Sequence, residues 1–143
     1  MPKNIPMKVY ESFSFVEGSQ PNYEKLLSYF VVEGLFINNK GENPMVKPLI
    51  DYVAFIKSNI EAGNILSIKE TVVENSVTLF GKVGHIVSRY KLEAKTRGGM
   101  QTRYGVNLFQ IIKYGTAWKI SSMCWDDYED KRLFEVNMSE PNA

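Results

Sequence analysis

The sequence predicts an α+β fold in which helices cover one face of a curved antiparallel sheet. Residues 67–125 alternate or cluster β-branched and aromatic side chains, which fit the pleated surface of a sheet, with almost no helical period. The residues before them carry three stretches of helical period and one short apolar run. Helices followed by a succession of strands are the order typical of α+β domains.

The N-terminal part of the chain predicts three helices and a strand. Gly18 and Gly63 each follow a stretch of helical period and are typical helix stops, while Asn22 is a suitable N-cap for the second stretch. The polar loop 38–44 is rich in turn-forming residues, and we expect it to form a mobile rim. We therefore expect helices over Ile5–Val16, Asn22–Phe30 and Val46–Ala62, and a brief strand over Leu35–Ile37.

Three breaks divide the later apolar runs into strands. They lie at Glu74–Ser76, at the charged and glycine-rich link Lys91–Gln101, and at Tyr114–Thr116. These breaks have lengths typical of hairpin connections, so we expect consecutive strands to pair antiparallel. Beyond Trp125 the periodicity is lost, and residues 129–143 are expected to form a C-terminal coil on the surface.

Composition restricts the classes of function. The chain has 143 residues, which favours a single domain, and its 17 basic and 16 acidic side chains leave a net charge of +1. This balance gives no field that would attract nucleic acid or an anionic membrane surface. A single cysteine, Cys124, and a start without an apolar signal segment favour the cytoplasm. No apolar run is long enough to predict a membrane span.

Several motifs resemble the nuclear transport factor 2-like superfamily, and more narrowly its small, uncharacterised SnoaL-like bacterial branch. The resemblance extends from about Ile5 to Tyr128 and rests mostly on residues that define the fold. The motifs are Phe15-x-x-Gly18, Pro21-Asn22-Tyr23-Glu24-x-Leu26-x-x-Tyr29-Phe30, Phe80-Gly81-x-x-x-His85-x-x-Ser88-x-Tyr90, Arg103-Tyr104-Gly105-Val106-Asn107 and Gly115-x-x-Trp118-x-Ile120-x-x-x-x-Trp125.

The resemblance implies a cystatin-like cone, in which three N-terminal helices pack on a curved antiparallel sheet and a pocket opens at the mouth. It places one such domain over residues 1–128. In the ketosteroid-isomerase-like and polyketide-cyclase-like branches, an Asp or His in the pocket transfers a proton, assisted by a Tyr or a protonated Asp. This chain departs from that pattern, because Asp126, Asp127 and Asp130 are expected to lie beyond the sheet.

Glu70 and His85 remain as the candidates for a catalytic acid or base. Glu70 lies on the first long strand and is expected to share a face with Glu74, which makes it either a pocket base or an ion-paired strand residue. His85 is the single histidine; it is either a general base or a packed side chain with one hydrogen-bond partner. No companions of ligand type surround it, so no metal site is predicted, and no cofactor is expected.

A ligand pocket is predicted from aromatic and polar residues of the cone. Alternation along the strands places Arg89 on the same face as His85, and Arg103 on the same face as Asn107. A guanidinium that pointed into the cone would suit a carboxylate ligand. Arg89 and Tyr90 must face opposite ways, and the sequence does not decide which one faces inward. The candidate ligand-binding residues are Tyr10, Phe13, Tyr52, Phe55, Arg89, Tyr90, Asn107 and Trp118, some of which are alternatively core.

Two classes of function follow. The first is a module that binds a small apolar molecule, with or without a carboxylate; the second is a cofactor-free isomerase, cyclase or hydratase that uses Glu70 or His85 with a tyrosine. The absence of a predicted strand-borne Asp favours the first. Apolar side chains on both faces of the sheet, such as Phe80 and Leu79, also predict a homodimer that covers the outer face.

Overall fold

The structure is a computed structural model that describes residues 2–137. No helix in this range is long and apolar enough to cross a membrane. The elements, in chain order, are the 3-10 helix η1 (Pro2–Asn4), α1 (Ile5–Phe13), α2 (Tyr23–Ser28), β1 (Phe30–Asn38), β2 (Met45–Pro48), α3 (Leu49–Glu61), β3 (Ile65–Phe80), β4 (Val83–Thr96), β5 (Gly99–Tyr114), β6 (Ala117–Tyr128) and α4 (Lys131–Asn137).

The six strands form one curved sheet in the order β2-β1-β6-β5-β4-β3. Strands β3 to β6 pair antiparallel with their sequence neighbours, and β1 pairs antiparallel with β2. Only β1 and β6 are parallel among the described strands, and the long connection between them provides the crossover that a parallel pair requires. The predicted α+β class with a curved, mostly antiparallel sheet is confirmed.

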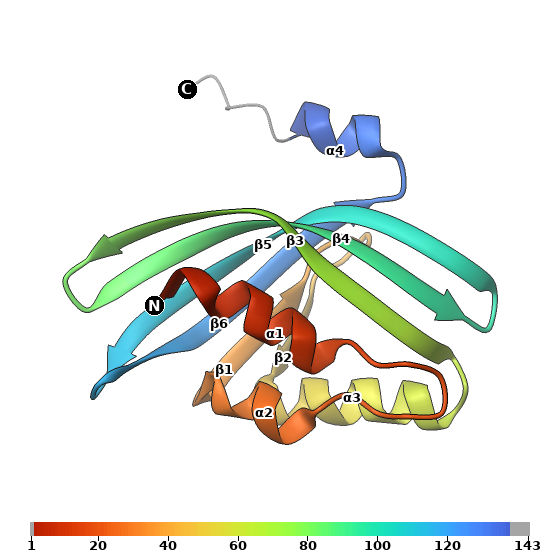
Figure 1. Cartoon of the computed structure of the whole chain (residues 1–143), viewed down its shortest axis with the longest axis horizontal. Coiled ribbons are helices and arrows are strands. Elements are labelled where there is room, and N and C mark those ends of the chain that lie inside the picture. Colours follow the sequence, from red (N-terminus) through yellow and green to blue (C-terminus); the bar gives the residue numbers. More distant parts are fainter. Residues whose placement is uncertain (1, 138–143) are drawn as a thin grey trace.

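Helices α1, α2 and α3 lie on the concave side of the sheet, and α4 lies on the opposite side (Figure 1). The core fills the space between the concave face and the three helices, where apolar side chains of both layers meet. Its largest fully buried members include Tyr10 of α1, Leu26 of α2, and Tyr90 and Phe109 of the sheet. The long sheet extends beyond the helices at both ends (Figure 1).

All three N-terminal helices are shorter than predicted because strand pairing takes over their ends. The first helix stops at Phe13 and does not continue to Val16, since Phe15 forms a bridge with Ile68 through backbone bonds of 2.9 and 3.1 Å. The second helix ends at Ser28 and not at Phe30, since Phe30 begins β1 and pairs with Ile120. The third helix begins at Leu49 and not at Val46, because Met45–Pro48 pairs with β1. Competition between local propensity and long-range pairing sets these boundaries.

The predicted break at Glu74–Ser76 is wrong, because β3 runs through it without interruption. Polar residues are tolerated there because β3 is an edge strand whose outer face is open to solvent. The hairpin turn lies instead at Gly81, which has a φ of 58°. The register of β3 shifts between Val72 and Glu74, as in a β-bulge, and such an extra residue reverses the faces on which later side chains lie.

The second predicted link, Lys91–Gln101, is shorter in the structure. β4 continues to Thr96 and β5 starts at Gly99, whose φ of 114° suits a glycine at a tight turn. The third turn, around Gly115, lies where the sequence predicts it. The four later strands are therefore longer and joined by tighter turns than expected.

The expectation of coil for residues 129–143 is wrong over Lys131–Asn137, which form α4. The helix starts where Asp130 Oδ1 accepts a hydrogen bond of 2.9 Å from the backbone N–H of Arg132. Phe134 anchors it: the ring is 4% exposed and packs against Tyr104, with centroids 6.2 Å apart. A single anchoring ring leaves no periodicity for sequence analysis to detect. Residues 138–143 lie outside the described residues.

Candidate functional site

A cavity of about 400 Å³ lies between the concave face of the sheet and helices α1 and α3. Most of its wall is apolar and includes Val9, Ile56 and Leu92. Polar side chains come mainly from β3, β4, β5 and β6. This combination of an apolar wall with a few converging polar groups is characteristic of small-molecule sites.

The register of the sheet explains why these polar groups converge. Glu70 of β3 lies opposite Leu92 of β4, which lies opposite Arg103 of β5. One step along, Tyr90 lies opposite Gly105, and Gly105 opposite Asp127. Side chains two residues apart on a strand share a face, so all of these project into the cone.

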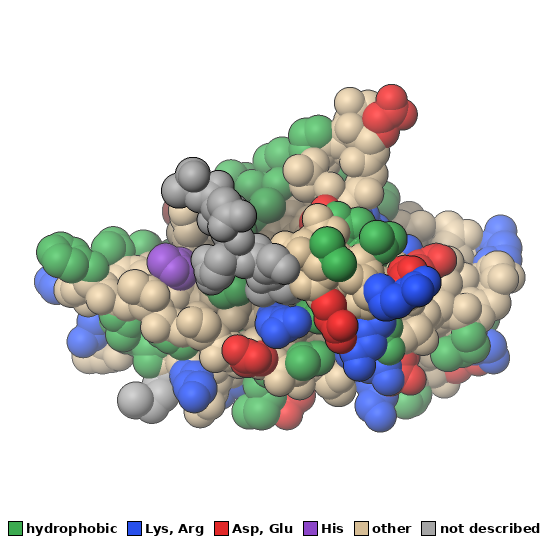
Figure 2. Space-filling model, turned by 90° about the horizontal axis from the view of Figure 1, so that it is seen from above, with side chains coloured by type: hydrophobic (Ala, Val, Ile, Leu, Met, Phe, Trp, Pro, Cys, Tyr) green, Lys and Arg blue, Asp and Glu red, His purple; other side chains and the backbone are tan. Residues whose placement is uncertain are grey.

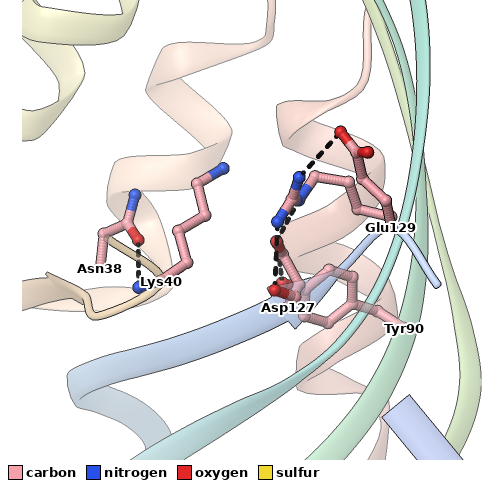
Figure 3. A network of polar contacts seen from close by, with 6 residues as sticks. Asn38, Lys40, Tyr90, Asp127 and Glu129 are labelled. Atoms are coloured by element: carbon pink, nitrogen blue, oxygen red, sulfur yellow. Dashed lines mark hydrogen bonds and ion pairs between the residues drawn. The ribbon is translucent and has the colours of Figure 1, made fainter. Parts of the chain in front are cut away.

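Tyr90, Asp127 and Arg103 form one connected polar network on this face. The Tyr90 hydroxyl donates to Asp127 Oδ2 over 2.7 Å, and Arg103 Nε donates to Asp127 Oδ1. Arg103 Nη2 also donates to the Asp127 carbonyl over 3.1 Å, and Nη1 to Glu129 Oε1 over 3.3 Å (Figure 3). Asp127 is 3% exposed, so this pairing satisfies a carboxylate that has almost no access to water.

Gly105 creates the space that the network occupies. A Cβ atom at this position would lie 2.5 Å from the Tyr90 hydroxyl and 2.5 Å from Asp127 Cβ. Any larger residue would therefore push Tyr90 and Asp127 apart. Burial, followed by the charge of Asp127, raises the pKa of Tyr90 above its ordinary value, so its hydroxyl stays protonated.

Asp127 corrects the expectation that no aspartate lies on a strand of the sheet. β6 extends to Tyr128, so Asp126 and Asp127 both belong to it. A signal was present in the sequence, since Met123, Trp125 and Asp127 continue a single alternation and all line the cavity. The charged residues that follow make this end of the strand resemble a surface tail.

Glu70 lines the cavity from β3 and is half-buried. Its backbone N–H donates to Ser14 Oγ over 3.0 Å, but its carboxyl has no hydrogen bond or ion pair with any described residue. Burial, and then the charge of Asp127, raise the pKa of Glu70 to about 8, while Lys40 acts in the opposite direction. A carboxyl with this pKa changes its protonation state close to neutral pH.

A second buried polar group connects α1 to the sheet. The Tyr10 hydroxyl donates to Ser88 Oγ over 2.7 Å and accepts a hydrogen bond of 2.9 Å from Asn107 Nδ2. Burial, and then the charge of Glu70, raise the pKa of Tyr10. Asn107 lines the cavity and is 1% exposed, and its Oδ1 has no partner among the described residues.

Aromatic rings form the other wall of the cavity. Phe36 and Tyr52 stack with centroids 4.2 Å apart and an angle of 9° between their planes. Trp125 meets Tyr52 edge-on at 5.6 Å. Phe36 was not among the residues predicted for the pocket, although it lies in the strand that the sequence predicts over Leu35–Ile37. A planar apolar ligand would complement such a wall.

At the rim, Asn38 and Lys40 lie across from Tyr90 and Asp127 (Figure 3). Asn38 Oδ1 accepts a hydrogen bond of 3.1 Å from the backbone N–H of Lys40. Lys40 belongs to the loop that the sequence predicts as a rim, and it places a cation at the edge of the cavity. Its opposing effect on the pKa of Glu70 indicates that the two charges interact.

Six predicted site residues lie together in the cavity wall: Phe13, Tyr52, Phe55, Glu70, Tyr90 and Asn107. Tyr10 is buried beside the wall and acts through Asn107 without lining the cavity. Trp118 is only partly buried and packs against the core away from the cavity.

Arg89 and His85 face the outer side of the sheet, because inward Tyr90 sets the alternation along β4. Arg89 Nη1 lies 3.7 Å from Glu74 Oε2, and its guanidinium lies 4.8 Å from the Phe134 ring of α4. His85 is exposed, and the histidine is visible on the outer face in Figure 2. Neither residue can reach the cavity, which removes both from the candidate site.

The bulge in β3 overturns another expectation. Because the register shifts between Val72 and Glu74, Glu70 faces the cavity whereas Glu74 faces outward, its side chain 66% exposed. Asn107 and Gln110 of β5 face opposite sides of the sheet, with Gln110 exposed. Within residues 2–137, no group of three or more His, Cys, Asp or Glu side chains is arranged to hold a metal ion.

Comparison with solved structures identifies the architecture. A proposed aromatic ring hydroxylase from Novosphingobium aromaticivorans superposes with a TM-score of 0.72 at 16% identity, covering 87% of this chain and 85% of that one. A nuclear transport factor 2-like superfamily protein from Salmonella enterica gives 0.68 at 11% identity, covering 87% of each chain. The chain has the nuclear transport factor 2-like fold.

A protein of unknown function from Nostoc punctiforme, which is described as having a cystatin-like fold, also superposes on this chain. Its TM-score is 0.64 at 10% identity, and the match covers 87% of this chain and 86% of that one. No family model and no curated protein matches the sequence. The nuclear transport factor 2-like fold thus rests on structure, and these low identities do not carry over any activity.

Proposed function

We propose that the cone binds a small, mostly apolar molecule and that Glu70 transfers a proton to and from it in a cofactor-free isomerisation, cyclisation or hydration. The observation that carries the proposal is the Glu70 carboxyl, which faces an apolar cavity without a hydrogen bond or ion pair to any described residue. At about pH 7, a pKa of about 8 leaves roughly a tenth of the carboxyls ionised. Both the base and its conjugate acid are then available for catalysis.

The remaining polar groups support binding and orientation. The hydroxyl proton of Tyr90 is held by Asp127, so Tyr90 is suited to positioning the ligand beside Glu70 and not to donating that proton. Arg103 is balanced by Asp127 and Glu129. Because Arg89 is outside the cone, an uncharged ligand fits this interior better than the carboxylate-bearing one expected from the sequence.

Solvent-deuterium exchange tests the proposal. The α-protons of tetralone, an apolar bicyclic ketone, are followed by NMR in D₂O with the wild-type protein, Glu70→Gln and Glu74→Gln. Glu74 is the matched control because it lies on the same strand but faces outward. We expect Glu70→Gln to abolish protein-dependent exchange and Glu74→Gln to retain it. Exchange that persists in Glu70→Gln, or a wild-type rate equal to that of buffer, would refute the catalytic proposal.

A second candidate is binding without turnover. It is favoured by the network of Tyr90, Asp127 and Arg103, whose hydrogen bonds satisfy one another and leave few groups to assist a reaction. Binding is read from the fluorescence of Trp125, which lines the cavity. A ligand that binds at equal affinity to wild type and Glu70→Gln, with no exchange in either, would support this second candidate.

A further inference from the structure

Asn107 holds a hydrogen-bond acceptor that the protein itself does not use. Its Oδ1 has no partner among the described residues, although the side chain is 1% exposed. Its Nδ2 is engaged with the Tyr10 hydroxyl at 2.9 Å, and that hydroxyl is in turn held by Ser88. The amide is thus fixed from one side with its carbonyl oxygen unsatisfied.

An unpaired buried carbonyl oxygen is unfavourable, because it loses its hydrogen bonds to water without a replacement, and native proteins rarely leave one without a role. Two other buried side-chain atoms in residues 2–137 have no partner: Asn75 Oδ1 and Arg89 Nε. Neither residue lines the cavity. Asn107 therefore differs from them, because its side chain belongs to the wall of the cavity.

The surroundings of Asn107 restrict the chemistry of its partner. Asn107 lies opposite Trp125 in the sheet, and the Trp125 ring meets the stacked rings of Phe36 and Tyr52 edge-on. An amide oxygen accepts a hydrogen bond and cannot donate one. A partner must therefore combine a flat apolar body with a hydroxyl or N–H group.

We infer that Asn107 selects the ligand: the cavity takes a neutral, planar aromatic or conjugated molecule whose hydroxyl or N–H donates to Asn107 Oδ1. This inference rests on the proposed function, since it names the ligand class of the same cavity. Glu70 acts on the bound molecule, whereas Asn107 decides which molecules bind. A site built to receive a donor discriminates strongly against an analogue that lacks it, because the buried acceptor is then left unpaired.

Three bicyclic probes of similar size test the inference: naphthol, its methyl ether, and naphthoate. Their affinities are measured by calorimetry on the full-length protein at neutral pH, together with Asn107→Leu and Gln110→Leu. Gln110 is the matched control, an amide on the same strand that faces outward and is exposed. The ratio of the affinities for naphthol and its methyl ether is measured on the wild-type protein, so the inference can be tested even if Asn107→Leu does not fold.

The wild-type protein is expected to bind naphthol about tenfold more tightly than the methyl ether. Asn107→Leu should reduce that ratio to about one, and Gln110→Leu should leave it unchanged. Three results would each overturn the inference while leaving the cavity as a binding site. They are equal wild-type affinities for naphthol and its methyl ether, tighter binding of naphthoate than of naphthol, and an unchanged affinity ratio in Asn107→Leu. If no probe binds, the inference and the proposed binding function both fail.

Discussion

Replacing Glu70 by glutamine should change how the stability of the protein depends on pH. The pKa of Glu70 rises from 4.5 to about 8 on folding, so the folded state favours the protonated carboxyl. The stabilisation from this proton is complete below the unfolded pKa and is lost as the pH rises through the folded pKa. The folded protein is therefore penalised increasingly from about pH 4.5 to about pH 8, and the penalty is complete above about pH 8, when Glu70 is ionised inside the cone.

The pKa shift sets an upper limit of roughly 5 kcal/mol on this penalty. Glu70 is half-buried at an open cavity, where water relieves part of the cost, so we expect about 1–2 kcal/mol. Glutamine has a similar shape and cannot ionise. The Glu70→Gln protein should match the wild type at about pH 4 and exceed its free energy of unfolding at about pH 9 by this amount.

Urea unfolding, followed by tryptophan fluorescence over a series of pH values, measures the difference. Glu74→Gln controls for a change of net charge on the same strand, because Glu74 faces outward and is 66% exposed. The free energy of unfolding of Glu74→Gln should change with pH in parallel with that of the wild type. If the Glu70→Gln and wild-type curves are also parallel across the whole range, Glu70 does not titrate in the cavity, and its proposed catalytic role loses its physical basis.

Three further predictions concern other parts of the fold. Gly105→Ala should lower the free energy of unfolding by about 1–3 kcal/mol, because its Cβ displaces Tyr90 from Asp127; unchanged urea unfolding would contradict this. Phe134→Ala should remove the protection of 131–137 in hydrogen exchange while ligand affinity is retained; protection equal to wild type would show that the ring does not anchor α4. Light scattering should give twice the 16.4 kDa of one chain, since exposed apolar side chains remain on the outer face; a single-chain mass at micromolar concentration would exclude the homodimer.

The sequence predicts the fold well because the fold depends on repeated signals. Alternation over dozens of residues identifies the long strands, and helical period identifies the three helices on the concave side. Individual boundaries are less predictable, since the end of the first helix depends on a bridge between Phe15 and Ile68, which are 53 positions apart in the sequence numbering. The outer face has mixed acidic, basic and apolar side chains, which give little pattern to interpret (Figure 2).

The candidate site is only partly predictable. Alternation correctly groups Arg103 with Asn107, but it cannot choose between Arg89 and Tyr90, because a strand with apolar residues on both sides fits either orientation. The structure decides for Tyr90, which is packed against α1 and bonded to Asp127. Asp127 was missed for a different reason, since its partner Arg103 is distant in sequence and the run of charged residues after Trp125 resembles the start of a tail.

The bulge near Val73 has a consequence for how relatives of this chain diverge. It reverses the phase of the alternation between the two halves of β3, so Glu70 faces the interior although Glu74, four residues further on, faces the surface. A relative that lost this one residue would regain simple alternation and could keep the identities of the distal half, whereas one that kept the residue without the bulge would have to exchange polar and apolar identities there to keep its core. Single-residue gaps at this position should therefore leave the hydropathy pattern between 74 and 80 unchanged, and alignments that ignore the bulge and place no gap there will pair interior positions with surface ones.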